Sequence, residues 1–130
     1  MNNNEKQIIS CEKAPAAVGP YSHAVIYKDT IYCSGQLGLD PNTNELAGNN
    51  IESQTKQAFE NIINVLEACG SSLDNALMVK VYLADIKDFG KVNEIYATYF
   101  KEGNYPARVA FEAANLPKGG LVEIEVIAGK

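Results

Sequence analysis

The chain has 130 residues, of which 46% are hydrophobic and 21% are charged, as is ordinary for a globular protein. Its formal net charge of −5 and its scattered basic residues argue against nucleic acid or an anionic membrane as the main partner, because phosphate groups are bound by clustered Lys and Arg. No apolar run approaches the ~20 residues that span a bilayer and no signal peptide is recognisable, so a cytoplasmic protein is expected.

A loop punctuated by proline and glycine leads into the first apolar segments of the chain. Segments 22–27 and 30–35 are separated only by Lys28 and Asp29, which predicts a β-hairpin with a two-residue turn. Residues 37–50 are rich in Pro, Asn, Asp and Gly, and these residue types favour turns over helix.

Apolar residues then recur every three or four positions between Ile51 and Leu66, which predicts an amphipathic helix. Asn50 is a suitable N-cap for this helix, and Gly70 is a suitable residue to end it. The alternating segment 76–86 predicts a strand that follows the helix. One face of this strand is expected to hold Leu77, Val79, Val81 and Leu83.

A second helix is predicted between Asp88, as its cap, and the vicinity of Gly103. Its buried stripe is expected to consist of Phe89, Val92, Ile95, Tyr96, Tyr99 and Phe100. The last apolar runs, about 107–113 and 121–128, predict two more strands. The order of elements, β-β(-β)-α-β-α-β-β, predicts an α+β sheet with both helices on one face, in a single domain over residues 1–130.

Each of the last two strands has one apolar face and one mixed face, because side chains alternate along a strand. We expect the apolar faces to lie under the helices; they consist of Val109, Phe111 and Ala113 and of Val122, Ile124, Val126 and Ala128. The mixed faces consist of Arg108, Ala110 and Glu112 and of Leu121, Glu123, Glu125 and Ile127. A mixed face is too apolar for open water and too charged for a monomer's core. A homo-oligomer whose interface encloses a small polar pocket is therefore expected.

Arg108 and Glu123 are charged residues within apolar strand segments, and two interpretations of them are open. Arg108 could form a structural ion pair with Glu123 or Glu112. Alternatively, its guanidinium could bind a carboxylate or phosphate through two parallel hydrogen bonds, near the sheet end that Pro106 defines. Glu123 lies among Leu, Val and Ile, and apolar surroundings raise a carboxyl pKa toward the range of a general acid or base. Its plainer role is that of an exposed edge residue.

Four further residues could line a pocket, although each also has a structural explanation. Tyr21 follows a Gly-Pro pair at a strand entrance and could simply pack on its loop. Ser34 ends a strand beside Gly35, which lets a ligand approach the backbone but equally terminates a strand. Asn93 follows Phe89 on the second helix and could be an exposed amide. The residues alone predict a pocket for a small anion with one acid/base residue.

The three cysteines, Cys11, Cys33 and Cys69, are odd in number and widely spaced. This pattern predicts buried thiols rather than a disulfide framework or a metal site, and leaves open whether Cys33 or Cys69 is redox-active. His23 is the only histidine, which excludes a metal or catalytic site with two histidines from one chain.

The segment PARVAFEAANLPKGGLVEIEVIA, residues 106–128, resembles the C-terminal signature of the Rid family, the reactive intermediate deaminases also called YjgF-type proteins. The resemblance extends to three earlier blocks, APAAVGPYSHAV, IYCSGQLGLDPNTNEL and DFGKVNEIYATYF. Four ordered blocks make the match far more specific than any single motif, and the chain is most similar to the RidA subgroup.

This resemblance implies a chorismate-mutase-like, or ferredoxin-like, α+β fold that assembles as a homotrimer with clefts between subunits. It also implies hydrolysis of imines derived from 2-aminoacrylate and 2-aminocrotonate to 2-keto acids and ammonia, without metal or organic cofactor. A functional link to the pyridoxal-phosphate enzymes that generate such imines follows from the same resemblance.

By the same resemblance, Arg108 matches the arginine that binds the substrate carboxylate, and Glu123 matches the glutamate that activates water. The other cleft residues of the family are matched by Tyr21, Ser34, Phe89 and Asn93. Many relatives have a cysteine two residues after the arginine, where this chain has Ala110. The backbone N–H of Ala110 can still bind substrate, whereas thiol chemistry at this position is absent.

Other functions compete with deamination. A ribonuclease or translation inhibitor is disfavoured by the acidic net charge, the single histidine and the lack of an aromatic and basic platform. A carboxylate sensor or a chaperone-like module would use the same clefts, and a role exercised through a protein partner is also open. A measurement of substrate turnover distinguishes these non-catalytic functions from an enzyme.

Overall fold

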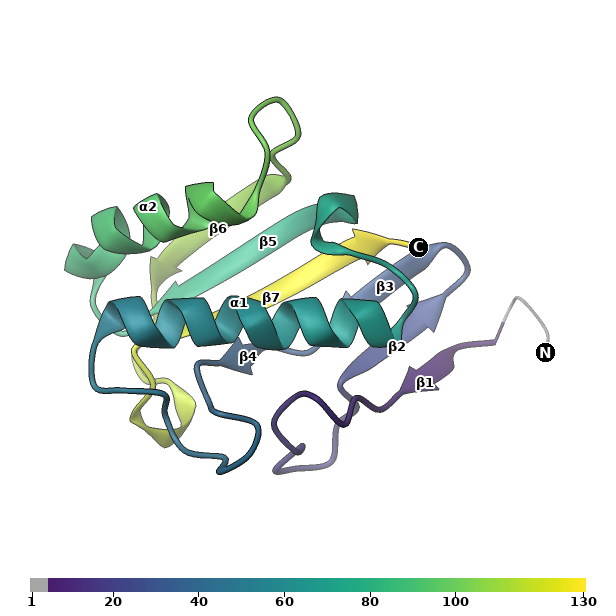
Figure 1. Cartoon of the computed structure of the whole chain (residues 1–130), viewed down its shortest axis with the longest axis horizontal. Helices are drawn as coiled ribbons and strands as arrows, with labels where there is room; N and C mark the ends of the chain where they lie inside the picture. The colour runs from purple at the N-terminus through teal and green to yellow at the C-terminus, as the bar shows by residue number, and fades with distance from the viewer. Residues whose placement is uncertain (1–4) are drawn as a thin grey trace.

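The computed structural model describes residues 5–130, which form one seven-stranded sheet with two α-helices (Figure 1). The strands are β1 (Gln7–Ile9), β2 (Ala24–Tyr27), β3 (Thr30–Cys33), β4 (Gln36–Leu37), β5 (Ala76–Leu83), β6 (Ala107–Glu112) and β7 (Val122–Gly129). The helices are α1 (Ile51–Ala68) and α2 (Phe89–Tyr99), and short 3₁₀ turns are η1 (Leu73–Asn75), η2 (Ile86–Asp88) and η3 (Pro117–Gly119).

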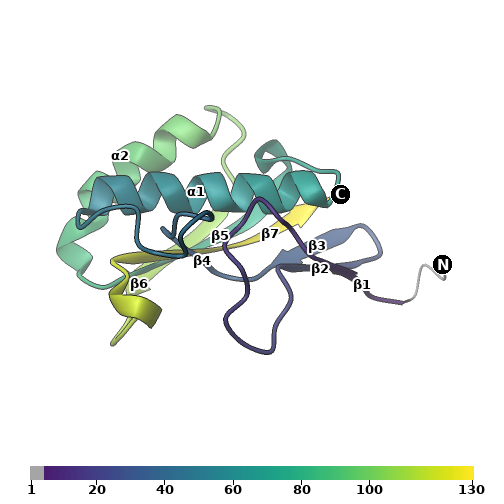
Figure 2. The ribbon, with the colours of Figure 1, turned by 60° about the horizontal axis from the view of Figure 1, so that its bottom comes forward.

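The strand order is β1-β2-β3-β7-β5-β6, and β4 pairs with β7 beyond the end of β3. Only β5 and β6 pair in parallel, with α2 as the crossover between them. Figure 2 shows that α1 and α2 lie on the same face of the sheet and leave the other face uncovered. The predicted α+β sheet with two helices on one face is confirmed. The uncovered side is called the open face below.

The predicted hairpin and first helix are confirmed in detail. β2 and β3 are joined by Lys28 and Asp29, and Lys28 adopts a left-handed conformation with φ 56°. The Asn50 side chain accepts a hydrogen bond from the Ser53 N–H at 2.7 Å, as expected of an N-cap. Gly70 follows the helix with φ 77°, a conformation that favours glycine.

The predicted cap of the second helix is only partly correct. Asp88 precedes α2, but its side chain makes no capping hydrogen bond. The preceding turn η2 already holds Asp88 in a helical conformation, with φ −79° and ψ −4°, whereas a capping side chain needs an extended backbone. Asp85 caps η2 instead by accepting a hydrogen bond from the Lys87 N–H at 2.9 Å.

One predicted strand face is wrong at a single residue, and another is reversed. In β5, Val79 and its alternating neighbours are buried, but Leu77 is 55% exposed because the pairing with β7 shifts register between Ala76 and Met78. In β6, the predicted core face of Val109, Phe111 and Ala113 points away from the helices; the parallel register instead places Arg108 level with Val79 and Ala110 level with Val81.

The open face of β6 carries the residues that were expected in the core. Val109 is 41% exposed and Phe111 is 46% exposed, and the Phe111 ring packs edge-on against Tyr82 with centroids 5.2 Å apart. The mixed residues Arg108 and Ala110 face α2 instead. The two shortest strands, β1 and β4, were given no residues in the prediction, because runs of two or three residues show no usable period; the predicted order allowed only one optional further strand before the first helix.

Within residues 5–130, neither helix combines the length and the apolar character that crossing a bilayer requires.

Candidate functional site

The predicted site residues gather in two separate cavities. The first, of about 320 Å³, contains Tyr21, Ser34, Gly35 and Glu123 and is called the Glu123 cavity. The second, of about 410 Å³, is called the Arg108 cavity, and its wall consists of Asn93, Tyr96, Ala97, Tyr105, Pro106 and Arg108.

Glu123 lies on β7, with its side chain half-buried on the open face. Burial raises the pKa of its carboxyl above the ordinary value of 4.5, and the nearby charge of Glu125 raises it further. Gly35 lies directly against this carboxyl, because a Cβ atom at position 35 would be 2.9 Å from Glu123 Oε2. Only glycine leaves room for the carboxyl in this orientation. A raised pKa favours the protonated form more than in an ordinary carboxyl, which suits a group that both takes and gives a proton.

Ser34 and Tyr21 enter the Glu123 cavity from neighbouring loops. Ser34 donates its N–H to the His23 carbonyl at 3.0 Å, and its hydroxyl donates to the Ser22 carbonyl at 2.5 Å. The Tyr21 hydroxyl accepts a long hydrogen bond, 3.4 Å, from the Val18 N–H. These hydrogen bonds hold the segment before β2 and the segment after β3 together beside Glu123.

His23 fixes the loop that precedes Tyr21. Its Nδ1 accepts a hydrogen bond from the Cys11 N–H at 2.9 Å, and its Nε2 donates to the Pro15 carbonyl at 2.8 Å. The two partners assign the donor role to Nε2 and the acceptor role to Nδ1. Because the ring is buried with both nitrogens engaged, His23 is a structural residue rather than an acid/base group.

Arg108 lies at the edge of the sheet, on the face covered by α2. Its Nη1 donates to Asn93 Oδ1 at 2.7 Å, and its Cζ lies 4.7 Å from the Tyr96 ring centroid and 5.3 Å from that of Phe89. Two aromatic rings and one amide therefore orient the guanidinium. Phe89 and Asn93 contact Arg108, as expected for residues of one site.

The structural ion pair that was weighed for Arg108 does not form. No carboxylate of residues 5–130 lies within 4.0 Å of the guanidinium nitrogens. Glu112 instead accepts a hydrogen bond from the Ile86 N–H at 2.9 Å, and Glu123 lies on the opposite face of the sheet. A guanidinium that is oriented but lacks a carboxylate partner can bind an anion from solution.

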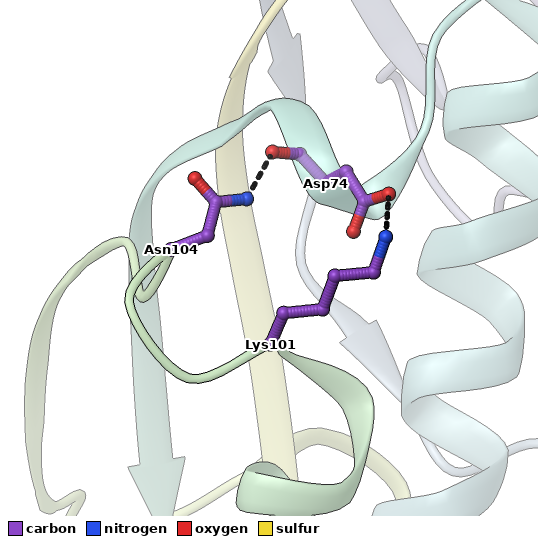
Figure 3. Close-up of polar contacts among 3 residues, drawn as sticks. All are labelled: Asp74, Lys101 and Asn104. Atoms are coloured by element: carbon purple, nitrogen blue, oxygen red, sulfur yellow. Dashed lines mark hydrogen bonds and ion pairs between the residues drawn. The ribbon is translucent and has the colours of Figure 1, made fainter.

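The loop before Arg108 is anchored by Asp74 of η1, as Figure 3 shows. Lys101 Nζ lies 3.3 Å from Asp74 Oδ2, and the Asn104 side chain donates to the Asp74 carbonyl at 3.1 Å. Gly103, with φ 87°, makes the turn between these two anchors. Tyr105, which follows Asn104, forms part of the wall of the Arg108 cavity.

Some lining residues were not identified from the sequence. Gln36 and Lys118 line the Glu123 cavity, and Tyr96 and Tyr105 line the Arg108 cavity. Tyr96 could have been found, because it follows Asn93 by three positions on one helix and so shares its face. Ala110 lies half-buried on the helix face beside Arg108, and binding of substrate by its N–H stays a prediction.

Cysteine and metal chemistry gain no support within residues 5–130. Burial raises the pKa of the Cys33 thiol to about 12, with a smaller contribution from Cys69, so the reactive thiolate is disfavoured. Cys11, Cys33 and Cys69 are all free and buried. No cluster of three or more His, Cys, Asp or Glu side chains in the described part of the chain could hold a metal ion.

Comparisons with known proteins agree over almost the whole chain. The family model described as endoribonuclease L-PSP matches residues 11–130. Over 128 residues the chain is 49% identical to a protein of Rattus norvegicus and 47% identical to one of Homo sapiens, both named 2-iminobutanoate/2-iminopropanoate deaminase. Each match covers 98% of this chain and 93% of the relative.

Solved structures with the same fold include a protein of the conserved Rid family from Yersinia pestis. It has a TM-score of 0.94 and 44% identity, covering 97% of this chain and 100% of that chain. RidA from the Antarctic bacterium Psychrobacter sp. has a TM-score of 0.91 and 48% identity, covering 95% of this chain and 99% of that one.

Proposed function

The chain belongs to the endoribonuclease L-PSP family, as its resemblance to Rid proteins predicted, and we propose that it hydrolyses 2-imino acids to 2-keto acids and ammonia, as a 2-iminobutanoate/2-iminopropanoate deaminase. The observation that carries the proposal is the Arg108 guanidinium, which is oriented by Asn93, Tyr96 and Phe89 and has no carboxylate partner among residues 5–130. A 2-imino acid supplies that carboxylate.

Glu123 is the acid/base group in this proposal. Its carboxylate takes a proton from water while the water oxygen bonds to C2 of the imine, and the C=N electron pair moves to nitrogen, which receives the proton. In the resulting carbinolamine, Glu123 moves the hydroxyl proton to the amine; the C–N bond breaks, ammonia leaves and the keto group forms. Proton transfer of this kind typically contributes ~10²–10⁴-fold to a rate.

The proposed reaction uses two copies of the chain. Arg108 faces α2, whereas Glu123 faces away from the helices, so one chain cannot present both to one substrate. The open face also exposes Tyr32, Val109 and Phe111, whose apolar surface favours contact with another protein surface. We therefore place the active site in a cleft between subunits of a homotrimer. There Arg108 of one subunit binds the carboxylate, and Glu123 of the next activates water.

Mixing two inactive variants tests this arrangement. Arg108→Ala and Glu123→Gln are unfolded together in equal amounts, refolded, and compared with each variant refolded alone. Random assembly gives about one quarter of the wild-type activity, because a working cleft needs an intact Arg108 from one subunit and an intact Glu123 from its neighbour. Complete absence of recovery in verified mixed oligomers would mean that each site belongs to a single chain.

Turnover separates an enzyme from a carboxylate sensor or chaperone-like module. A threonine or serine dehydratase generates the imine in situ, and semicarbazide traps whatever is not hydrolysed. The protein is expected to lower the rate of trapping. An unchanged rate would leave Arg108 as part of a binding site alone.

The ribonuclease activity in the family's name fits the residues of this chain less well than deamination does. His23 is buried with both ring nitrogens engaged, and the net charge of −5 disfavours a polyanion. Absence of salt-sensitive RNA binding is expected. The cytoplasmic location and the functional link to pyridoxal-phosphate enzymes stay predictions.

A further inference from the structure

One buried polar group in the wall of the Arg108 cavity has no hydrogen-bond partner. The Tyr96 hydroxyl is buried and makes no hydrogen bond to any of residues 5–130. A buried polar group that is left unpaired costs free energy, so native proteins rarely keep one unless a ligand, an ion or a water meets it. Among the described residues, the Thr55 hydroxyl is also unpaired, but it lies in the wall of neither cavity.

Packing fixes the ring that carries this hydroxyl. The Tyr96 ring packs against Phe59, with centroids 5.8 Å apart, and against Phe100, with centroids 4.6 Å apart. Arg108 lies over the same ring, with Cζ 4.7 Å from its centroid. Because only 4% of Tyr96 is exposed, the side chain cannot turn into solvent to find a partner. The hydroxyl therefore stays beside Arg108 and remains unpaired until another molecule reaches it.

Arg108 and Tyr105 are the neighbours whose charges act on the hydroxyl. Burial raises the pKa of Tyr96, the charge of Arg108 lowers it by less, and Tyr105 raises it slightly further. The hydroxyl is therefore protonated at neutral pH and is available as a hydrogen-bond donor. Arg108 and Tyr105 are both exposed, and exposed side chains exchange rotamers rapidly. A small ligand that binds Arg108 can thus displace the atoms that cover the hydroxyl.

We propose that Tyr96 is a further substrate-binding residue, whose hydroxyl donates a hydrogen bond to the carboxylate that Arg108 binds. The inference rests on the proposed function for the identity of that carboxylate. Asn93 already accepts a hydrogen bond from Nη1 of Arg108, which leaves the other N–H groups of the guanidinium for the ligand. Two carboxylate oxygens accept about four hydrogen bonds, so the hydroxyl supplies a donor in addition to the guanidinium.

Tyr96→Phe removes the hydroxyl and retains the ring. If the hydroxyl serves binding, this variant should be as stable as the wild type or more stable, because it loses only an unpaired buried group. Tyr99→Phe is the matched control. Tyr99 follows on the same helix and also stacks on Phe59, with centroids 4.5 Å apart. Its hydroxyl donates to Glu60 at 3.0 Å, outside the Arg108 cavity.

Binding is measured without turnover by a ligand-observed NMR titration with 2-oxobutanoate, the keto acid formed from 2-iminobutanoate. We expect the Kd to rise about tenfold for Tyr96→Phe, because a hydrogen bond to a charged group is lost. Tyr99→Phe is expected to keep the wild-type Kd. Butanone, which lacks the carboxylate, is expected to bind to none of the three proteins. In the trapping assay, Tyr96→Phe should lose kcat/KM mainly through a higher KM.

An unchanged Kd for Tyr96→Phe would overturn the inference and assign the hydroxyl to a bound water. Loss of the oligomer or of stability in this variant, measured by size-exclusion chromatography and urea denaturation, would assign the hydroxyl to a partner subunit or to the fold and would also overturn it. A wild type that binds 2-oxobutanoate through Tyr96 but does not hydrolyse the imine would instead overturn the proposed function and leave the carboxylate site in place.

Discussion

Arg108 and Glu123 lie on opposite faces of one sheet, because Arg108 is level with the buried Val79 of β5 and Glu123 is level with Tyr82, three positions further along the same strand. The two charges therefore do not form an ion pair within the chain. Their separation also explains why each lines its own cavity. In the proposed reaction, Arg108 and Glu123 come from two different copies of the chain.

Arg108→Ala is expected to abolish turnover while the protein remains folded and oligomeric. The side chain is exposed and has no carboxylate partner in the described residues, so the free energy of unfolding should change by less than about 1 kcal/mol. Arg108→Lys, which keeps the charge but loses the planar fork, should raise KM. Chemical denaturation and the trapping assay measure the two effects. A monomeric or unfolded Arg108→Ala product would instead indicate that Arg108 stabilises the fold or the oligomer.

Gly35→Ala is expected to reduce turnover by about tenfold or more, because the new Cβ would meet Glu123 Oε2 at 2.9 Å and displace the carboxyl group. Gly90→Ala is the matched control, since a Cβ on this α2 residue has no heavy atom within 4 Å. Helix propensity predicts that the control gains stability. Equal kcat/KM for the two variants would show that the close approach at Gly35 is not needed.

The pH dependence of turnover should report Glu123. A general base works when ionised, and burial and Glu125 raise the pKa of this carboxyl, so the acid limb of the kcat/KM profile is expected above pH 4.5. Glu125→Gln removes the like charge and should move that limb to lower pH, whereas burial remains. If the acid limb of the Glu125→Gln profile stays at the wild-type pH, Glu125 is excluded as a cause of the raised pKa of Glu123.

The same carboxyl links stability to pH. Because folding raises the pKa of Glu123, its contribution to stability is present below the unfolded pKa and is lost as pH rises through the folded pKa. Glu123→Gln should therefore increase the free energy of unfolding at neutral pH relative to wild type, and this difference should vanish in acid. Urea denaturation at several pH values measures it.

Asn61→Ala should destabilise the fold more than any change at the site. This side chain is 0% exposed and donates to the Leu37 and Leu39 carbonyls at 3.1 and 2.9 Å, which ties β4 to α1. Leaving two buried carbonyls without donors should cost about 2–4 kcal/mol in the free energy of unfolding. Asn64→Ala, which removes an exposed hydrogen bond to Lys13 from the same helix, should cost less than about 1 kcal/mol.

Local patterns were sufficient to predict much of this fold. The helix from Ile51, its Asn50 cap and its glycine end are encoded by neighbouring residues and were correct. The faces of β7 were also correct, because its apolar residues alternate without exception from Val122 to Ala128. The site residues were selected by resemblance and residue chemistry; the structure places most of them in two groups, and their roles stay predictions.

What only the tertiary structure decided is which strand face meets the helices and which site residues meet each other. Alternation in β6 showed that Arg108 and Ala110 share a face, but not that the face lies against α2; the parallel register with β5 sets that. The pattern in β5 likewise could not show the register shift that exposes Leu77. A strand's sequence fixes the period of its side chains, whereas the phase of that period depends on hydrogen bonds to partner strands distant in the chain.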